Sequence, residues 1–235
     1  MLNNLPRHIV WMCSFLLIFS AVAADSNSVV PPAFRMPTAS TKFENITFVV
    51  FDTETTGFSP ANDRLVELGA VKIRNGEVLG EKNWLINPQR WIPYYVQKVH
   101  NITPEMVKDQ PVFADIYPEF LEFIGDAVLI AHNAPFDIRM LAAEAERNGM
   151  PMPKNAVLDS LVLSRNWYPE LKSHTVSAMI DHFSIATEGM QAHRANADSL
   201  FVFHAIQKEM DRRSESPRFS ELLKDAGQIH HFAAE

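Results

Sequence analysis

Residues 49–57, which read VVFDTETTG, decide both the fold and the chemistry expected of this chain. The apolar run from Ile46 to Phe51 is rich in β-branched and aromatic residues, as is typical of a strand. Two carboxylates, Asp52 and Glu54, then follow with one residue between them. Side chains two positions apart on an extended backbone point to the same side, so we expect both carboxylates to project together from the end of a central strand.

Two neighbouring carboxylates repel each other unless a cation lies between them. Mg²⁺ or Mn²⁺ is the partner that suits hard oxygen ligands. An isolated Asp-x-Glu is more often a strand end with two solvated acids, because short motifs match by chance. The metal interpretation therefore depends on what the rest of the chain supplies.

The first residues of the chain have the three-part layout of a secretory signal peptide. Arg7 and His8 precede an apolar run over residues 9–19, and small residues follow at 21–23. The run is short for a membrane span. We predict a signal peptide over residues 1–23, hence an exported protein (periplasmic or extracellular) with no membrane contact after cleavage. Two alternatives stay open: an uncleaved anchor over residues 9–24, or a cytoplasmic protein that starts at Met36.

Composition restricts the remaining function classes. The 235 residues suit one domain, and 47% apolar residues suffice for one core. A net charge of −7 disfavours nonspecific wrapping of long duplexes by charge alone, but is compatible with gripping a few phosphates through metal ions. The single cysteine, Cys13, lies in the predicted signal peptide, so the processed chain would have no disulfide and no zinc–cysteine site.

The pattern of apolar residues predicts an α/β domain. A linker over 24–42 precedes strands at 42–52, 65–73 and 77–86, and Asn75-Gly76 predicts a tight hairpin between the last two. The later part alternates helical periods with short buried strands at 127–131 and 157–159. Helices are predicted after Thr103 and over 135–147, 161–168, 175–183 and 195–213.

This order predicts a mixed five-stranded sheet, built from an antiparallel three-strand meander plus two parallel strands, with helices on both faces. The domain is expected to span residues 43–213. Residues 214–235 are expected to form a polar, solvated C-terminal tail with a weak helical segment.

Further polar clusters accompany the first pair of acids. Asp137 follows a buried strand in HNAPFD, and His193 precedes Asp198 in HRANAD. Each cluster alone has an ordinary structural explanation, such as an acid at a helix N-terminus. Five residues turn a helix by about 500°, so His193 and Asp198 can converge only if His193 lies in the loop before the helix.

Taken together, these segments resemble the DEDDh class of 3′–5′ exonucleases, to which the proofreading subunits of bacterial replicative polymerases belong. Residues 51–57, 131–137 and 193–198 match its three motifs in order, and residues 99–103 and 157–161 resemble accessory segments. The resemblance covers roughly residues 44–212 and implies a ribonuclease H-like fold.

The resemblance also implies roles for individual residues. Four acids would bind two divalent ions, Mg²⁺ or Mn²⁺: Asp52, Glu54, Asp137 and Asp198. His193 would be the general base that takes a proton from the attacking water, and the unperturbed pKa of histidine, about 6.5, suits that step. The reaction implied releases nucleoside 5′-monophosphates from a 3′ end.

Further assignments concern substrate binding. Thr55, Thr56 and Gly57 lie where family members contact the terminal nucleotide, and Phe58 lies where relatives place an apolar wedge. His100 belongs to a loop that often reads His-Gly-Ile-Thr in the family, with Asn101 here in place of glycine.

Three neighbours of these motifs are expected to be structural. We interpret Asp159 as a helix cap, His132 as a residue that orders the second motif, and Arg194 as solvated.

We therefore expect an exported, metal-dependent 3′–5′ exonuclease that acts on nucleic acid 3′ ends, DNA rather than RNA, without a stable protein partner. One alternative is a cytoplasmic proofreading or RNA-trimming nuclease that starts at Met36. The other is a catalytically silent nucleic-acid-binding module.

Overall fold

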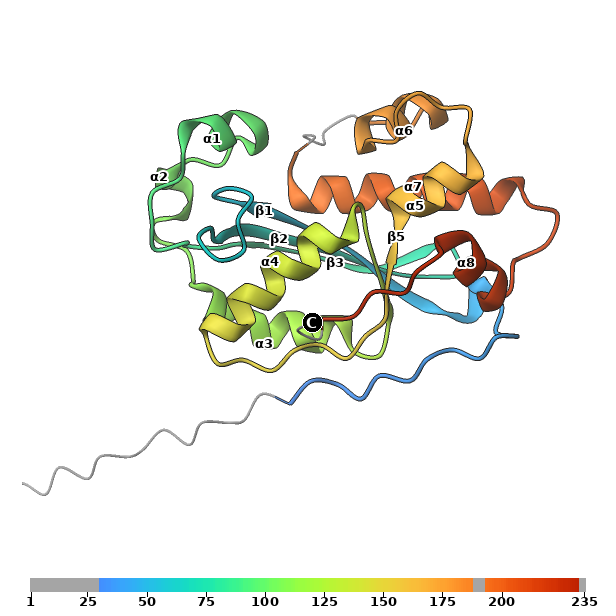
Figure 1. Ribbon diagram of the computed structural model, residues 1–235, viewed down its shortest axis with the longest axis horizontal. Coiled ribbons are helices and arrows are strands. Elements are labelled where there is room, and N and C mark those ends of the chain that lie inside the picture. Colours follow the sequence, from blue (N-terminus) through green and yellow to red (C-terminus); the bar gives the residue numbers. More distant parts are fainter. Residues whose placement is uncertain (1–29, 188–192, 233–235) are drawn as a thin grey trace, which may run out of the picture.

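The computed structural model describes residues 30–187 and 193–232, which form a five-stranded sheet in the order β3-β2-β1-β4-β5 (Figure 1). The strands are β1 (Thr47–Thr55), β2 (Leu65–Arg74), β3 (Glu77–Leu85), β4 (Val128–Ala131) and β5 (Val157–Asp159). β1, β2 and β3 pair antiparallel, whereas β4 pairs parallel with β1 and β5 parallel with β4. The mixed five-stranded sheet predicted from the sequence is confirmed.

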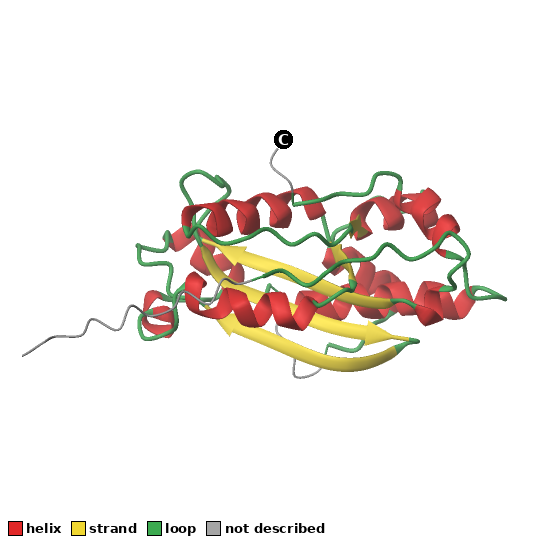
Figure 2. Ribbon diagram, turned by 90° about the horizontal axis from the view of Figure 1, so that it is seen from below, coloured by secondary structure: helices red, strands yellow, loops and turns green. Residues whose placement is uncertain are grey.

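Helices cover both faces of this sheet (Figure 2). They are α1 (Tyr94–His100), α2 (Pro104–Val107), α3 (Phe113–Ile124), α4 (Ala134–Arg147), α5 (Ser160–Trp167), α6 (Val176–Phe183), α7 (Ala195–Arg212) and α8 (Phe219–Ala226), with a 3₁₀ turn at Phe43–Asn45. No helix in the described part of the chain is long and apolar enough to cross a membrane.

The alternation of side chains along β1 divides the core into two layers. Val49 and Phe51 pack in one apolar cluster with α3 and α4. Phe48 and Val50 pack in the other with α5, α7 and α8. Asp52 and Glu54 continue the second series, so they project toward the face that α7 covers.

Two local features differ from the sequence-based expectation. The first strand starts at Thr47, because residues 43–45 form a 3₁₀ turn, and it continues to Thr55, so the first two acids lie inside the strand. Helix α1, of which residues 99 and 100 were expected in a loop, was not predicted. Its seven residues bury only Val96 and His100, which is too short a pattern to reveal a helical period.

The prediction of a solvated C-terminal tail is wrong for the part that the structure describes. Phe219, Leu222 and Ala226 of α8 are buried, because this spacing places them on one side of the helix. Phe232 is 1% exposed and lies 6.2 Å from the Phe51 ring, measured between ring centroids. His230 also forms an isolated β-bridge with Val157.

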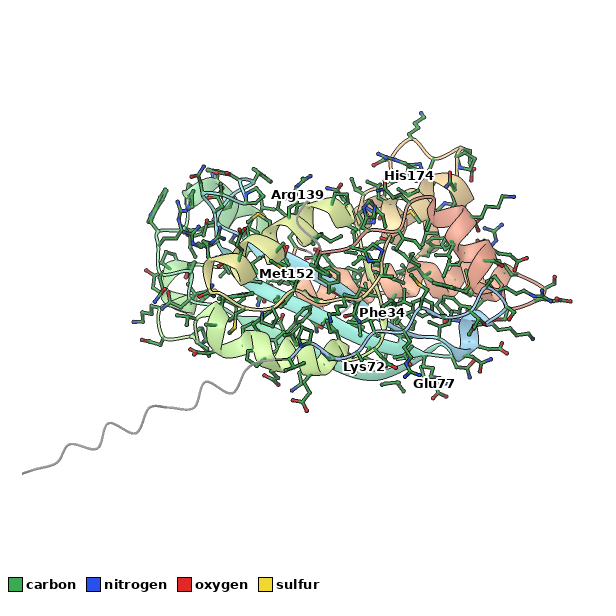
Figure 3. All side chains as sticks on the ribbon, turned by 60° about the horizontal axis from the view of Figure 1, so that its bottom comes forward. Phe34, Lys72, Glu77, Arg139, Met152 and His174 are labelled. Atoms are coloured by element: carbon green, nitrogen blue, oxygen red, sulfur yellow. The ribbon has the colours of Figure 1, made fainter. Side chains whose placement is uncertain are left out.

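The segment before β1 packs partly onto the same layer. Phe34 contacts the apolar cluster that includes α8 (Figure 3), and the Thr41 carbonyl accepts a hydrogen bond from the Phe219 amide. The predicted signal peptide over 1–23 lies outside the described residues.

Candidate active site

Three carboxylates from two distant parts of the chain meet at one place. Asp52 and Glu54 of β1 and Asp198 of α7 have carboxylate oxygens that all lie within 4.8 Å of one another. Asp198 is 8% exposed, in the first turn of a helix that packs across β1 and β2. The convergence of the first and third motifs, expected from the resemblance, is therefore present in the structure.

A glycine permits α7 to approach the sheet this closely. Gly69 pairs with Asp52 across the β1–β2 ladder. A Cβ atom at this position would lie 2.2 Å from the backbone carbon of Ala195 and 2.3 Å from the backbone nitrogen of Asn196. Only a residue without a side chain lets the first turn of α7, and with it Asp198, rest on the strand.

A buried ion pair holds the same turn in place. Glu67, opposite Glu54 on β2 and 0% exposed, accepts hydrogen bonds from Arg194 Nε at 3.0 Å and from the Ala195 amide at 2.9 Å. Arg194 Nη2 and Asn83 Nδ2 also donate to this carboxylate. Arg194 is thus not the solvated side chain that we expected. It fixes the backbone between His193 and α7.

Asp137 lies close enough for its charge to act on Asp52 and Glu54, but in a different local setting. It is buried in the first turn of α4, where its Oδ1 accepts hydrogen bonds from Thr53 N at 3.0 Å and Thr53 Oγ1 at 2.6 Å. Thr53 points to the opposite side of β1 from Asp52 and Glu54, so Asp137 joins the site from the α4 side. Its charge still reaches Asp52 and raises the pKa of that carboxyl.

Burial and repulsion from neighbouring carboxylates raise the pKa values of all four acids. Burial is the largest cause in each case, and neighbouring carboxylates add to it. The pKa of Glu54 is raised to about 9, that of Asp137 to about 7 and that of Asp198 to about 6, and the pKa of Asp52 also rises well above its ordinary value. A set of half-buried and buried oxygen ligands whose negative charges oppose one another fits a divalent cation.

His193 occupies the loop position that convergence with Asp198 requires. It precedes α7 with φ of 60° and has an exposed side chain. Its charge lowers the pKa of Asp198, against the larger effect of burial. Histidine and aspartate therefore come together as expected, with the imidazole on the open side of the site.

The second motif is held together by the residues that we interpreted as structural. Asp159 Oδ1 accepts hydrogen bonds from the amides of Leu161 at 2.8 Å and Asn133 at 3.0 Å, which confirms it as a helix cap and ties β5 to α4. His132 Nδ1 lies 3.0 Å from Ser160 Oγ.

A cavity of about 770 Å³ opens beside His193 and Asp198. Its wall includes Arg165, Lys172 and His174, from α5 and the loop before α6 (Figure 3 labels His174). Sequence analysis did not identify these basic residues, because nothing local distinguishes them from ordinary surface residues.

The turn after β1 carries the predicted substrate-binding residues. Thr55 Oγ1 donates to the Gly57 carbonyl at 2.6 Å, and Thr56 Oγ1 donates to Asp63 at 3.1 Å, so both buried hydroxyls shape the turn itself. Phe58, at its tip, is 75% exposed, and its ring centroid lies 6.2 Å from that of Phe136.

His100 ends α1 and is 2% exposed. Its Nδ1 accepts a hydrogen bond from the Ile102 amide at 3.0 Å, and Nε2 has no hydrogen-bond partner among the described residues. Burial lowers its pKa, an effect that the neighbouring Thr55 backbone opposes. Asn101 adopts φ of 58°, so asparagine takes the left-handed conformation that glycine often supplies at this position.

Comparison with known proteins agrees with this geometry. The RNase T family model, described as exonuclease, matches residues 49–204. A PolC-type DNA polymerase III of Clostridium perfringens is 38% identical over 169 residues, which are 70% of this chain and 12% of the polymerase. The corresponding protein of Bacillus subtilis is 36% identical over 92% of this chain and 15% of its own length. The chain thus spans a small part of these curated relatives.

Solved structures share the fold. Exonuclease X, in complex with 5′ overhanging duplex DNA, superposes with a TM-score of 0.60 at 23% identity, over 74% of this chain and 98% of the other. Exonuclease I of E. coli, in complex with a dA16 oligonucleotide, gives a TM-score of 0.65 at 20% identity, over 72% of this chain and 42% of the other.

Proposed function

This chain belongs to the RNase T exonuclease family, in its DEDDh class, and from that premise we propose that it is a metal-dependent 3′–5′ exonuclease acting on DNA. The observation that carries the proposal is the meeting of Asp52, Glu54 and Asp198 within 4.8 Å, with Asp137 and His193 beside them. A module that only bound nucleic acid would not need the complete set of groups that hydrolysis requires.

The four acids would hold two divalent cations, Mg²⁺ or Mn²⁺, which when bound neutralise charge on the phosphodiester and provide an activated water. His193 accepts the proton that the attacking water loses, because its ring is exposed at the mouth of the site beside Asp198. Thr53 keeps Asp137 in its position through two hydrogen bonds. The turn over residues 55–57 and the ring of Phe58 contact the terminal nucleotide, and His100 supports that turn.

DNA is the proposed polymer because the curated relatives are DNA polymerases and two of the similar solved structures, exonuclease X and exonuclease I, contain DNA. Another similar structure concerns the recognition of a histone mRNA stem-loop by a 3′-exonuclease. An RNA-trimming activity is the alternative. Equal concentrations of a 5′-labelled DNA strand and an RNA strand of the same sequence, with Mg²⁺, separate the two by rate.

The three-part layout of residues 1–23 supports export of the mature enzyme. N-terminal sequencing of the protein from its native host tests this. A first residue near 24 supports export, Met36 supports a cytoplasmic enzyme, and an intact Met1 in a membrane fraction supports an anchor.

The activity is tested on a 5′-labelled single strand with Mg²⁺ or EDTA. Wild type is expected to shorten the strand one nucleotide at a time from its 3′ end with Mg²⁺ only, and Asp52→Asn to lose this activity. Asp126→Asn, which removes an exposed acid outside the site, is the matched control and should cut like wild type. Equal rates for Asp52→Asn and wild type would overturn the proposal.

A further inference from the structure

We propose that exposed aromatic residues on α1 and the loop before it form a stacking platform for unpaired bases upstream of the 3′-terminal nucleotide. The platform comprises Trp91, Tyr94, Tyr95 and Val99. The inference rests on the proposed nuclease function and adds to it a binding surface that lies outside the catalytic residues.

The first observation is the exposure of these side chains. Trp91 is 67% exposed, Tyr94 65%, Tyr95 58% and Val99 48%. With Phe58, they include every exposed phenylalanine, tryptophan and tyrosine in the described parts of the chain. Large apolar side chains that gather on a surface mark an interaction site, whereas scattered ones need no explanation.

The second observation is that the platform stands on a fixed base. Ile92 and Val96, on the inner side, are buried in a small apolar cluster with Val66, Ile102 and Val107. Gln97 Nε2 also donates to the Ile92 carbonyl at 2.7 Å. The aromatic rings are therefore held outward by a packed helix.

The third observation is continuity with the active site. His100, at the end of α1, neighbours the backbone of Thr55, the residue after Glu54. At the other end, Arg90 donates to the Asn62 carbonyl in the turn that carries Phe58. In Figure 1, α1 and the turn after β1 both lie toward the left end of the sheet, whereas α6 lies toward the right.

The charge of the region identifies the occupant. Residues 88–103 contain no aspartate or glutamate, although the whole chain has 28 acids. They contain two basic residues: Lys98, and Arg90, whose Nη1 lies 3.9 Å from Asp63 Oδ1. The Lys98 ammonium lies 4.6 Å from the centroid of the Tyr94 ring. Aromatic rings beside basic side chains are the combination that binds single-stranded nucleic acid, because every base can stack and every phosphate is anionic. A membrane or protein partner would leave the continuity with the active site unexplained.

The test measures binding in EDTA, where the proposed enzyme does not cut, by anisotropy of a labelled 12-nucleotide DNA strand. Tyr94→Ala/Tyr95→Ala is expected to weaken binding at least about tenfold, in line with the value of base–aromatic stacking. An abasic strand of equal length and charge should bind wild type about tenfold more weakly, and should bind wild type and variant alike. Val78→Ala/Leu79→Ala, which removes exposed apolar side chains on β3, is the control and should bind like wild type.

Three results would overturn the proposal. One is equal affinity of wild type and the tyrosine variant for the normal strand. Another is an equal loss on the abasic strand, which would show that the variant changed something other than stacking. The last is a wild-type dimer in sedimentation, a monomeric tyrosine variant, and the same DNA affinity for both. The surface would then join two copies of the chain.

Cleavage of a dinucleotide, which is too short to reach the platform, distinguishes the two proposals. Wild type and the tyrosine variant should cut it at the same rate with Mg²⁺. If both cut it while the strand affinities do not differ, only the platform is refuted. If neither cuts any substrate, the proposed function fails, whatever the binding result.

Discussion

Replacing Glu67 by glutamine is expected to destabilise the protein and to impair catalysis at the same time. The carboxylate is 0% exposed, and its partner Arg194 has a side chain that is 23% exposed. Glutamine keeps the shape but removes the charge that pairs directly with the guanidinium, so that Glu54 is the remaining acid whose charge acts on Arg194. Loss of one partner from a buried ion pair costs about 3–5 kcal/mol. For a protein of this size that corresponds to a Tm lowered by about 6–20 °C.

The assay is equilibrium unfolding in urea, followed by circular dichroism, for the variants at Glu67 and Arg194. Glu67→Gln and Arg194→Gln should each lose several kcal/mol of unfolding free energy. The double variant should lose less than the sum of the two, because it leaves no charge unpaired. The matched control is Glu44→Gln in the exposed Lys42–Glu44 pair, whose 3.9 Å separation predicts a loss below about 1 kcal/mol.

Activity is the second readout of the same variants. His193 and Asp198 lie on either side of the backbone that Glu67 holds, so kcat should fall at a temperature where Glu67→Gln is still folded. The reasoning is refuted if Glu67→Gln is no less stable than Glu44→Gln, or if the losses of the two single variants simply add in the double variant.

The same geometry leads to four further predictions. Gly69→Ala should prevent stable folding or abolish activity, because the added Cβ would lie 2.2–2.5 Å from backbone atoms of α7. Gly80→Ala is the control. Its Cβ would have its nearest neighbour at 3.5 Å, so this variant should change neither Tm nor the rate of cleavage. In EDTA, Tm should fall between about pH 5 and pH 9, because Glu54, with its pKa raised to about 9, binds its proton more tightly when folded, so stability is lost as the pH rises. Mn²⁺ should raise Tm by several degrees at pH 8 and by less at pH 5.5; an equal rise at both values in scanning fluorimetry would contradict the assignment of the acids. His193→Ala should lower kcat by about 10²–10⁴-fold and leave Tm unchanged. A lower Tm in this variant would show that the residue is structural.

Most of the fold was predictable because its signals are local. Alternating apolar residues, the Asn75-Gly76 turn and the short buried strands each appear within a few residues of sequence. The same local rules placed Asp52 and Glu54 on one side of β1 and His193 in the loop before α7. Only the resemblance to a family could bring Asp137 and Asp198 to them, because convergence of residues that lie 85 and 146 positions after Asp52 has no local signal.

The features that were not predicted depend on contacts between distant elements. The pair of Glu67 and Arg194 joins residues 127 positions apart, and each looks like a surface charge when read alone. Helix α1 is too short to show a period, and Phe232 is buried only because it reaches Phe51 on the sheet. These contacts are properties of the packing, which a single sequence does not display.

The identity of the first product released from a DNA strand with a labelled 3′-terminal nucleotide tests the proposed chemistry most directly. If the four acids and His193 hydrolyse the last phosphodiester bond of the strand, the product is a nucleoside 5′-monophosphate. It should form with Mg²⁺ or Mn²⁺, and it should not form in EDTA or with Asp52→Asn. A nucleoside 3′-monophosphate, a longer fragment, or release that continues in EDTA would contradict it.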